Sequence, residues 1–220
     1  MNLENTQKAR FNMIEQQVRP WNVSDPVVLG LMSSIKREDF VPAAHKALAF
    51  ADLEIPLADG EAMLNPKVEA RMVQDLHIQP TDKVLEIGTG SGFVTALLAS
   101  RAQRVISMEI SATQADAARA NLSVAGITNA EVRCADGSKG AMADGPFDAI
   151  FLGGSVAEVP QNLLDSLKVG GRLIAVVGTE PIMTAHIVTR VNATEFTTTR
   201  PWDANIARLK GFDELSRFKF

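Results

Sequence analysis

The feature that most constrains the fold is a short apolar strand that leads directly into three closely spaced glycines and then a helix. Residues 84–92 read VLEIGTGSG, and apolar positions recur at helical spacing over 93–101. Glycine lets the chain turn sharply after a strand and lets its backbone approach a ligand closely. The motif therefore predicts the first βα unit of a ligand-binding α/β sheet.

The chain after residue 80 continues to alternate between strand and helix patterns. Apolar runs predict strands at 83–87, 104–108, 131–134, 147–152 and 172–177. Helical spacing predicts helices at 93–101, 112–124 and 159–167. The alternating Thr-rich tail, 182–220, predicts two more strands in an antiparallel edge hairpin. We expect an α/β fold with a doubly wound, mostly parallel seven-stranded sheet, the order of the last two strands remaining open.

The N-terminal third has a different, helical texture. Phe11, Ile14 and Val18 recur at helical spacing. Ser24-Asp25-Pro26 predicts the start of a second helix, with a capping side chain and a proline in the first turn. A further helix is expected after Pro66.

Between these helices, residues 40–65 read as a loop, and a loop of this length in a compact domain is usually functional. We expect an N-terminal helical and loop extension at 1–79 and a ligand-binding domain at 80–220, together forming one compact unit.

Composition excludes several classes of protein. The 22 basic and 26 acidic residues give a net charge of −4, so neither nucleic acid nor an anionic membrane is an expected partner. No apolar run approaches the ~18 residues of a membrane helix. The single cysteine, Cys134, and the three dispersed histidines provide no disulfide framework and no metal-ligand motif. We expect a cytoplasmic protein without a metal, either a monomer or a weak dimer.

The carboxylate of Glu86, within the glycine motif, indicates which charge the ligand carries. A dinucleotide fingerprint, G-x-G-x-x-G, would need glycine at Phe93, and Glu86 would repel a pyrophosphate. S-adenosylmethionine carries an ammonium and a sulfonium, which a carboxylate favours. The alternative is a strand, turn and helix that bind nothing.

Acidic residues also follow the next strands. Glu109 is expected to accept hydrogen bonds from the ribose hydroxyls. Asp136, beside Gly137, is expected to accept one from the adenine amino group. Either acid alone is also common as a solvated cap or turn. Asp148, inside the fourth strand, is expected to organise the glycine loop. The predicted cofactor-binding residues are Glu86, Gly88, Thr89, Gly90, Ser91, Gly92, Glu109, Ile110, Asp136 and Gly137.

With these residues the chain resembles the class I S-adenosylmethionine-dependent methyltransferases, and among them the protein-L-isoaspartate O-methyltransferase family. Residues 84–92 match that family's VLEIGTGSG, and 135–137 resemble its GDG. Upstream, residues 13–19 (MIEQQVR) resemble the family's opening helix and 36–42 (KREDFVP) its PRexFVP segment. The resemblance spans roughly residues 13–178, with a weaker echo in the tail. It implies S-adenosylmethionine as cofactor and isoaspartyl carboxylates of damaged proteins as methyl acceptors.

One segment departs from the family pattern. The family loop G-Q-T-I-S-Q-P, whose serine lies over the methyl-transfer site, reads GEAMLNP at residues 60–66. Leu64 therefore takes the serine position and Ala62 the threonine position. We expect Leu64 and Asn65 to be the loop residues nearest the methyl acceptor, with the extension at 1–79 covering the acceptor side.

Three functions remain open from sequence. The first is methylation of isoaspartyl residues, whose carboxylate is ionised at pH 7 and needs no general base. The second keeps the cofactor but transfers the methyl group to a small, more apolar acceptor. The third is a cofactor-binding adaptor with impaired catalysis.

Overall fold

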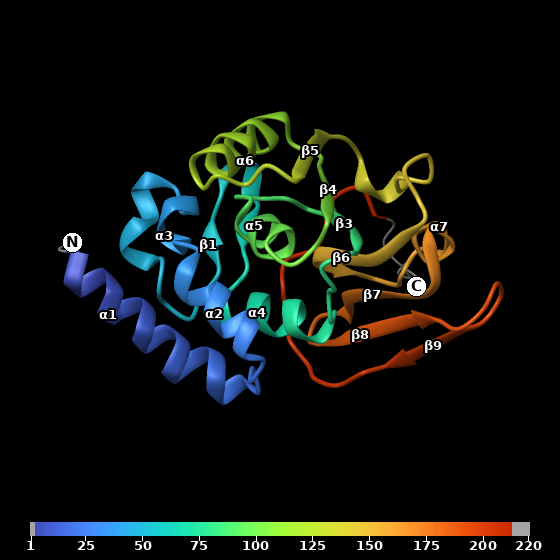
Figure 1. The fold of residues 1–220 in the computed structure, drawn as a ribbon, viewed down its shortest axis with the longest axis horizontal. Helices are drawn as coiled ribbons and strands as arrows, with labels where there is room; N and C mark the ends of the chain where they lie inside the picture. Colours follow the sequence, from blue (N-terminus) through green and yellow to red (C-terminus); the bar gives the residue numbers. More distant parts are fainter. Residues whose placement is uncertain (1–2, 213–220) are drawn as a thin grey trace, which may run out of the picture.

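A seven-stranded sheet forms the centre of the computed structural model, which describes residues 3–212 (Figure 1). Its order is β5-β4-β3-β6-β7-β8-β9. Neighbours from β5 to β7 pair in parallel, whereas β8 and β9 are antiparallel. The strands are β3 (Lys83–Ile87), β4 (Arg104–Glu109), β5 (Ala130–Cys134), β6 (Phe147–Val156), β7 (Leu167–Thr179), β8 (Ile182–Arg190) and β9 (Phe196–Thr199). The predicted sheet and its edge hairpin are confirmed, and the last two strands follow in chain order.

Helices precede the sheet and connect its strands. The N-terminal ones gather at one end of the molecule, away from the β8–β9 hairpin (Figure 1). The α-helices are α1 (Leu3–Met13), α2 (Pro26–Ser34), α3 (Arg37–Phe40), α4 (Pro66–Asp75), α5 (Phe93–Ala99), α6 (Ala112–Val124) and α7 (Gln161–Asp165). Shorter or irregular turns are η1 (Ile14–Val18), η2 (Arg19–Trp21), η3 (Ala43–Leu48), η4 (Ala58–Gly60) and η5 (Gly137–Lys139). Within residues 3–212, no helix combines the length and apolarity needed to cross a bilayer.

Side-chain capping sets where several helices begin. The Asp25 carboxylate accepts from the Val27 amide at 2.8 Å, directly before Pro26. Asn65 caps α4 in the same way, accepting from the Val68 amide at 3.2 Å. Caps of this kind satisfy amide groups that have no partner within the helix. The predicted helix starts at Pro26 and Pro66 are confirmed.

The central strands are buried on both faces, with successive side chains of β3 pointing alternately into two different cores. Val84 belongs to a core shared with the N-terminal helices, α5 and α6. Leu85 and Ile87 belong to a second core, which also contains Leu163 of α7 and Leu209 of the C-terminal segment. Glu86 shares the face of Val84 and therefore points towards α5.

The predicted loop at 40–65 is more ordered than its composition suggested. β1 (Ile55–Pro56) and β2 (Ala62–Met63) form a short antiparallel hairpin, which we call the acceptor-loop hairpin. Its turn places Asp59 and Gly60 at φ values of 59° and 74°. A Cβ on Gly90 would lie 3.3 Å from Leu57, so the hairpin lies directly against the glycine turn.

Phe11 shares its helical spacing with Ile14 and Val18, but it does not share their burial. Phe11 is 62% exposed, whereas Ile14 and Val18 are buried. Met13 is the only buried residue of α1. The fully buried part of this segment therefore begins at the last turn of α1, and the continuation Ile14–Val18 supplies further packing residues.

Arg37 joins the N-terminal segment to the rest of the molecule. Its fully buried guanidinium forms an ion pair with Glu69 of α4. It also donates to the carbonyl oxygens of Ala49, at 3.0 Å, and Leu64, at 2.7 Å. The Phe93 ring lies 5.0 Å from the guanidinium carbon, in cation–π geometry. A single side chain thus holds α4 and the residues that directly follow η3 and the acceptor-loop hairpin against α5.

We expect Arg37→Met to lower the free energy of unfolding by about 3–5 kcal/mol, because it leaves the Glu69 carboxylate buried without its partner. Urea denaturation followed by circular dichroism measures this loss. Arg104→Met is the matched control, since its pair with Glu131 is exposed and should contribute about 1 kcal/mol or less. Equal losses in the two variants would contradict the role given to Arg37.

Candidate active site

The glycine turn lies at the carboxyl end of β3, between β4 and β6. This is the point where the sheet order reverses, which is where ligands bind in doubly wound sheets. Gly88 has φ +86°, and a Cβ there would come within 2.7 Å of Leu209. A Cβ on Gly153 of β6 would lie 2.5 Å from the Gly88 carbonyl oxygen. Glycine at both positions leaves bare backbone at the centre of the cleft.

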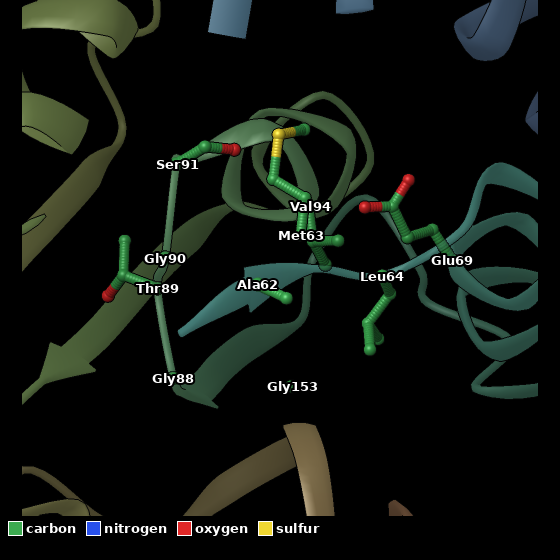
Figure 2. A pocket seen from close by; sticks show the side chains of 10 residues that line it. All are labelled: Ala62, Met63, Leu64, Glu69, Gly88, Thr89, Gly90, Ser91, Val94 and Gly153. Atoms are coloured by element: carbon green, nitrogen blue, oxygen red, sulfur yellow. The ribbon is translucent and has the colours of Figure 1, made fainter. Parts of the chain in front are cut away.

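Two pockets meet at Gly88. The first, which we call the loop-side pocket, is lined by Ala62, Met63, Leu64, Glu69, Gly88, Thr89, Gly90, Ser91, Val94 and Gly153 (Figure 2). The second, the tail-side pocket, is lined by Glu61, Ile87, Gly88, Met108, Glu109, Ile110, Gly137, Leu209 and Lys210. One cleft therefore extends from the acceptor-loop hairpin, across the glycine turn, to the ends of β4 and β5.

Glu109, the predicted acceptor of the ribose hydroxyls, is buried and lines the tail-side pocket. Its two carboxylate oxygens accept from the Gly90 amide at 2.9 Å and the Ser111 amide at 3.0 Å. These bonds hold the carboxylate against the glycine turn. Each oxygen retains further acceptor capacity for a ligand hydroxyl.

Glu86 lies beneath the turn and lines neither pocket. Its Oε2 accepts from the hydroxyls of Thr95, at 2.5 Å, and Ser107, at 2.6 Å, and Thr89 bonds Ser107 in turn. Burial raises the pKa of Glu86 to about 8, against the effect of the two hydroxyl donors. Its carboxyl group supports the turn from within the core, which differs from the direct ligand contact predicted for it.

The other predicted residues of the glycine turn divide into two groups. Thr89, Gly90 and Ser91 line the loop-side pocket. Gly92 lines neither pocket: it has φ +86° at the start of α5, and a Cβ there would meet Ala118 of α6 at 3.4 Å. Its glycine serves helix packing.

The predicted residues that follow β4 and β5 also differ from one another. Ile110 and Gly137 line the tail-side pocket. Asp136 does not, and its Oδ1 accepts from the amide and hydroxyl of Ser138. The hydroxyl bond is the largest cause holding the pKa of Asp136 below its usual value.

Asp148 does not organise the glycine loop, contrary to the prediction. It is the second residue of β6 and accepts from the Lys83 amide at 2.8 Å, at the amino end of β3. It also forms an ion pair with Lys168. The glycine turn lies at the opposite end of the same parallel strands, so the two cannot meet.

The two predicted acceptor-loop residues have different environments. Leu64 lines the loop-side pocket and is only 4% exposed, with its carbonyl held by Arg37. Asn65 is not among the lining residues, because its side-chain oxygen caps α4.

Sequence reasoning missed two groups at this site. Glu69, on α4, lines the loop-side pocket although it is 2% exposed. The sequence could have indicated Glu69, because it precedes Met72 by three residues and Leu76 by seven. This helical spacing places its carboxylate on the apolar face of the helix. Leu209 and Lys210 line the tail-side pocket, where Lys210 forms an ion pair with Glu61 at 2.7 Å. No local pattern predicts that contact.

Together, the seven-stranded sheet and the glycine turn at its switch point define a class I methyltransferase fold. A family model for protein-L-isoaspartate(D-aspartate) O-methyltransferase (PCMT) matches residues 8–201. The chain belongs to this family.

Similar proteins support this membership over most of the chain. A protein-L-isoaspartate O-methyltransferase of Methanoculleus marisnigri is 41% identical over 178 residues, 81% of each chain. Protein-L-isoaspartate O-methyltransferase 2 of Marinobacter nauticus is 36% identical over 203 residues, 92% of this chain and 93% of that one. A candidate enzyme of this name from Plasmodium falciparum, solved in complex with S-adenosyl-L-homocysteine, shares the fold. Its TM-score is 0.76 at 20% identity, covering 93% of this chain and 97% of that one.

We expect Glu86→Gln to stabilise the protein selectively at alkaline pH. The pKa of Glu86 is about 8 in the folded protein and 4.5 when the group is free, so between these pH values the folded state holds a proton that the unfolded state has released. The free energy of unfolding of the wild type therefore falls as the pH rises from 4.5 to 8. The neutral amide removes that loss, which amounts to about 1.4 kcal/mol per unit of pKa difference.

The measurement is the difference in unfolding free energy between the variant and the wild type at several pH values. Their difference should grow from pH 5 to pH 8 and then level. A difference independent of pH would show that Glu86 does not change its protonation on unfolding.

Proposed function

We propose that this protein transfers a methyl group from S-adenosylmethionine to the free α-carboxylate of L-isoaspartyl residues in damaged peptides and proteins. The observation that carries the proposal is the position of the acceptor-loop hairpin against the glycine turn. The same residues, Gly88–Ser91, thereby border both the cofactor cleft and the position reached by Leu64. Family membership supports the same acceptor.

The residues of the cleft fit the cofactor. Bare backbone at Gly88 and Gly153 permits close approach of a ligand, which a Cβ at either position would obstruct. Glu109 presents a fixed carboxylate suited to a ribose diol, and Ile110 and Gly137 border the same pocket. No lysine or arginine lines the loop-side pocket, so the cationic end of the cofactor meets no repelling side chain there.

When bound, S-adenosylmethionine supplies an electrophilic methyl group, and the protein has to align the acceptor and exclude water. The acceptor-loop hairpin covers the turn, while Arg37 fixes the backbone at Leu64. A carboxylate acceptor is already ionised at neutral pH and requires no proton removal. The absence of histidine from the lining of either pocket is consistent with this chemistry.

A second candidate function is transfer to a small apolar acceptor. It is favoured by Ala62 and Leu64, which occupy the positions of the two family hydroxyls and line the loop-side pocket together with Met63 and Val94. A site lined in this way binds a polar group less well than one that can hydrogen-bond it.

The proposed setting is the cytoplasm, where isoaspartyl-containing proteins would be the partners. The single cysteine supports a reducing compartment, because the chain has no intramolecular disulfide to maintain.

We expect Glu109→Gln to weaken binding of S-adenosylhomocysteine by about 10–100-fold, because a carboxylate that accepts both ribose hydroxyls becomes a neutral amide. Isothermal titration calorimetry measures the affinity. Asp116→Asn, on the exposed surface of α6, should bind as the wild type does. Unchanged affinity in Glu109→Gln would remove this residue from the cofactor site.

We expect tritiated methyl transfer from S-adenosylmethionine to an isoaspartyl peptide and none to its aspartyl twin, with the label released by base. Leu64→Ser should raise kcat/KM for that peptide, because it restores a hydroxyl in the pocket. Leu64→Ala is the matched control, since it removes the same bulk without adding a hydroxyl.

Both substitutions create a cavity at a buried position and should cost about 2–5 kcal/mol, so folding is checked by circular dichroism. Cofactor binding without transfer to the isoaspartyl peptide would overturn the proposal. It would then direct the search to apolar acceptors.

A further inference from the structure

Glu69 is a buried carboxyl group at the acceptor end of the cleft, and it has no part in the methyl-transfer step itself. It lies on α4, is only 2% exposed, and lines the loop-side pocket with Leu64 and the glycine turn. In the view of Figure 2 its carboxyl extends towards Met63 and Val94, whereas the Leu64 side chain extends the other way. Buried carboxylates are rare and require a partner for their charge.

Only one of its two oxygens is occupied. Oε2 accepts from Nη1 of Arg37, while Oε1 has no hydrogen-bond partner among residues 3–212. Arg37 is itself engaged, because Nε and Nη2 donate to the carbonyl oxygens of Ala49 and Leu64. The group that the pair presents to a ligand is therefore the free carboxylate oxygen.

The pocket that Glu69 lines limits what its carboxylate can bind. Ala62, Met63, Leu64 and Val94 supply an apolar lining, and the Thr89 hydroxyl is bonded to Ser107. A carboxylate oxygen accepts hydrogen bonds and donates none. The complementary group on a ligand is consequently a donor, such as an amide N–H.

An isoaspartyl peptide carries such a donor close to the methyl acceptor. The free α-carboxylate and the residue's own backbone N–H are attached to the same carbon. A peptide whose carboxylate faces the glycine turn therefore brings this N–H to the adjacent wall of the pocket.

We propose that Glu69 is a specificity-determining residue that accepts a hydrogen bond from the backbone N–H of the isoaspartyl residue. In this chain it would supply peptide recognition where other members of the family carry a serine at the position of Leu64. The inference rests on the proposed function and adds to it the contact by which a peptide is recognised.

The test is a double-substitution cycle between the protein and its substrate. One isoaspartyl peptide is normal, and a second is methylated on the backbone nitrogen of the isoaspartyl residue. The protein is compared with Glu69→Gln, whose amide oxygen still accepts from Arg37 while its NH2 group faces the pocket as a donor. Glu158→Gln, which replaces an exposed glutamate, is the matched control.

We expect N-methylation of the peptide to lower kcat/KM of the wild type and of Glu158→Gln by about 10–100-fold. Glu69→Gln should lose a similar factor with the normal peptide, chiefly through KM, and little more with the N-methylated one. Its affinity for S-adenosylhomocysteine should equal that of the wild type, which also reports folding.

Equal use of both peptides by the wild type overturns the inference without any variant, even if Glu69→Gln does not fold. The inference is also overturned if Glu69→Gln and N-methylation of the peptide lower kcat/KM independently of each other. Both results leave isoaspartyl methylation standing. Failure of the wild type to methylate either peptide instead overturns the proposed function and this inference with it.

Discussion

The buried guanidinium of Arg37 is the contact on which the acceptor side of this molecule depends. It pairs with Glu69, holds the carbonyl oxygens of Ala49 and Leu64, and lies over the Phe93 ring of α5. A buried charge is tolerated only where its partners are fixed. The requirement to satisfy Arg37 therefore places the acceptor-loop hairpin and α4 around the start of the helix that follows the glycine turn.

The glycine turn is supported from below by a second buried polar group. Glu86 bonds the hydroxyls of Thr95 and Ser107, and Glu109 bonds the amides of Gly90 and Ser111. Glu86 and Glu109, two glutamates of the adjacent strands β3 and β4, thus have different roles. Glu86 is fixed inside the core with a raised pKa, whereas Glu109 is fixed at the edge of the cleft, where a ligand can reach it.

The strands and helices around the motif were predictable because each apolar run ends at glycine, a polar cap or a change of period. β3 and α6 have the predicted bounds, and the cap at Asp25 was also readable. The burial of Ile14 and Val18 but not of Phe11 could not be predicted, because periodicity shows which residues share a face, but not whether another element covers that face. Asp148 was misplaced because it is the second residue of β6 and so lies at the amino end of that strand, whereas the glycine turn lies at the carboxyl end of β3.

By itself, the sequence determined the sheet, the glycine turn, and the acids that follow the strands, because these depend on local periodicity and backbone freedom. Only the tertiary structure decided which acids face the cleft. In that structure, Glu86 points into the core and Asn65 caps α4. The tertiary structure also brought Glu69 to the pocket, and Lys210 to Glu61 across about 150 residues of chain. Such contacts join segments far apart in the chain, so no local pattern encodes them. For Glu69 the physical reason is that a buried charge requires a partner, which Arg37 supplies.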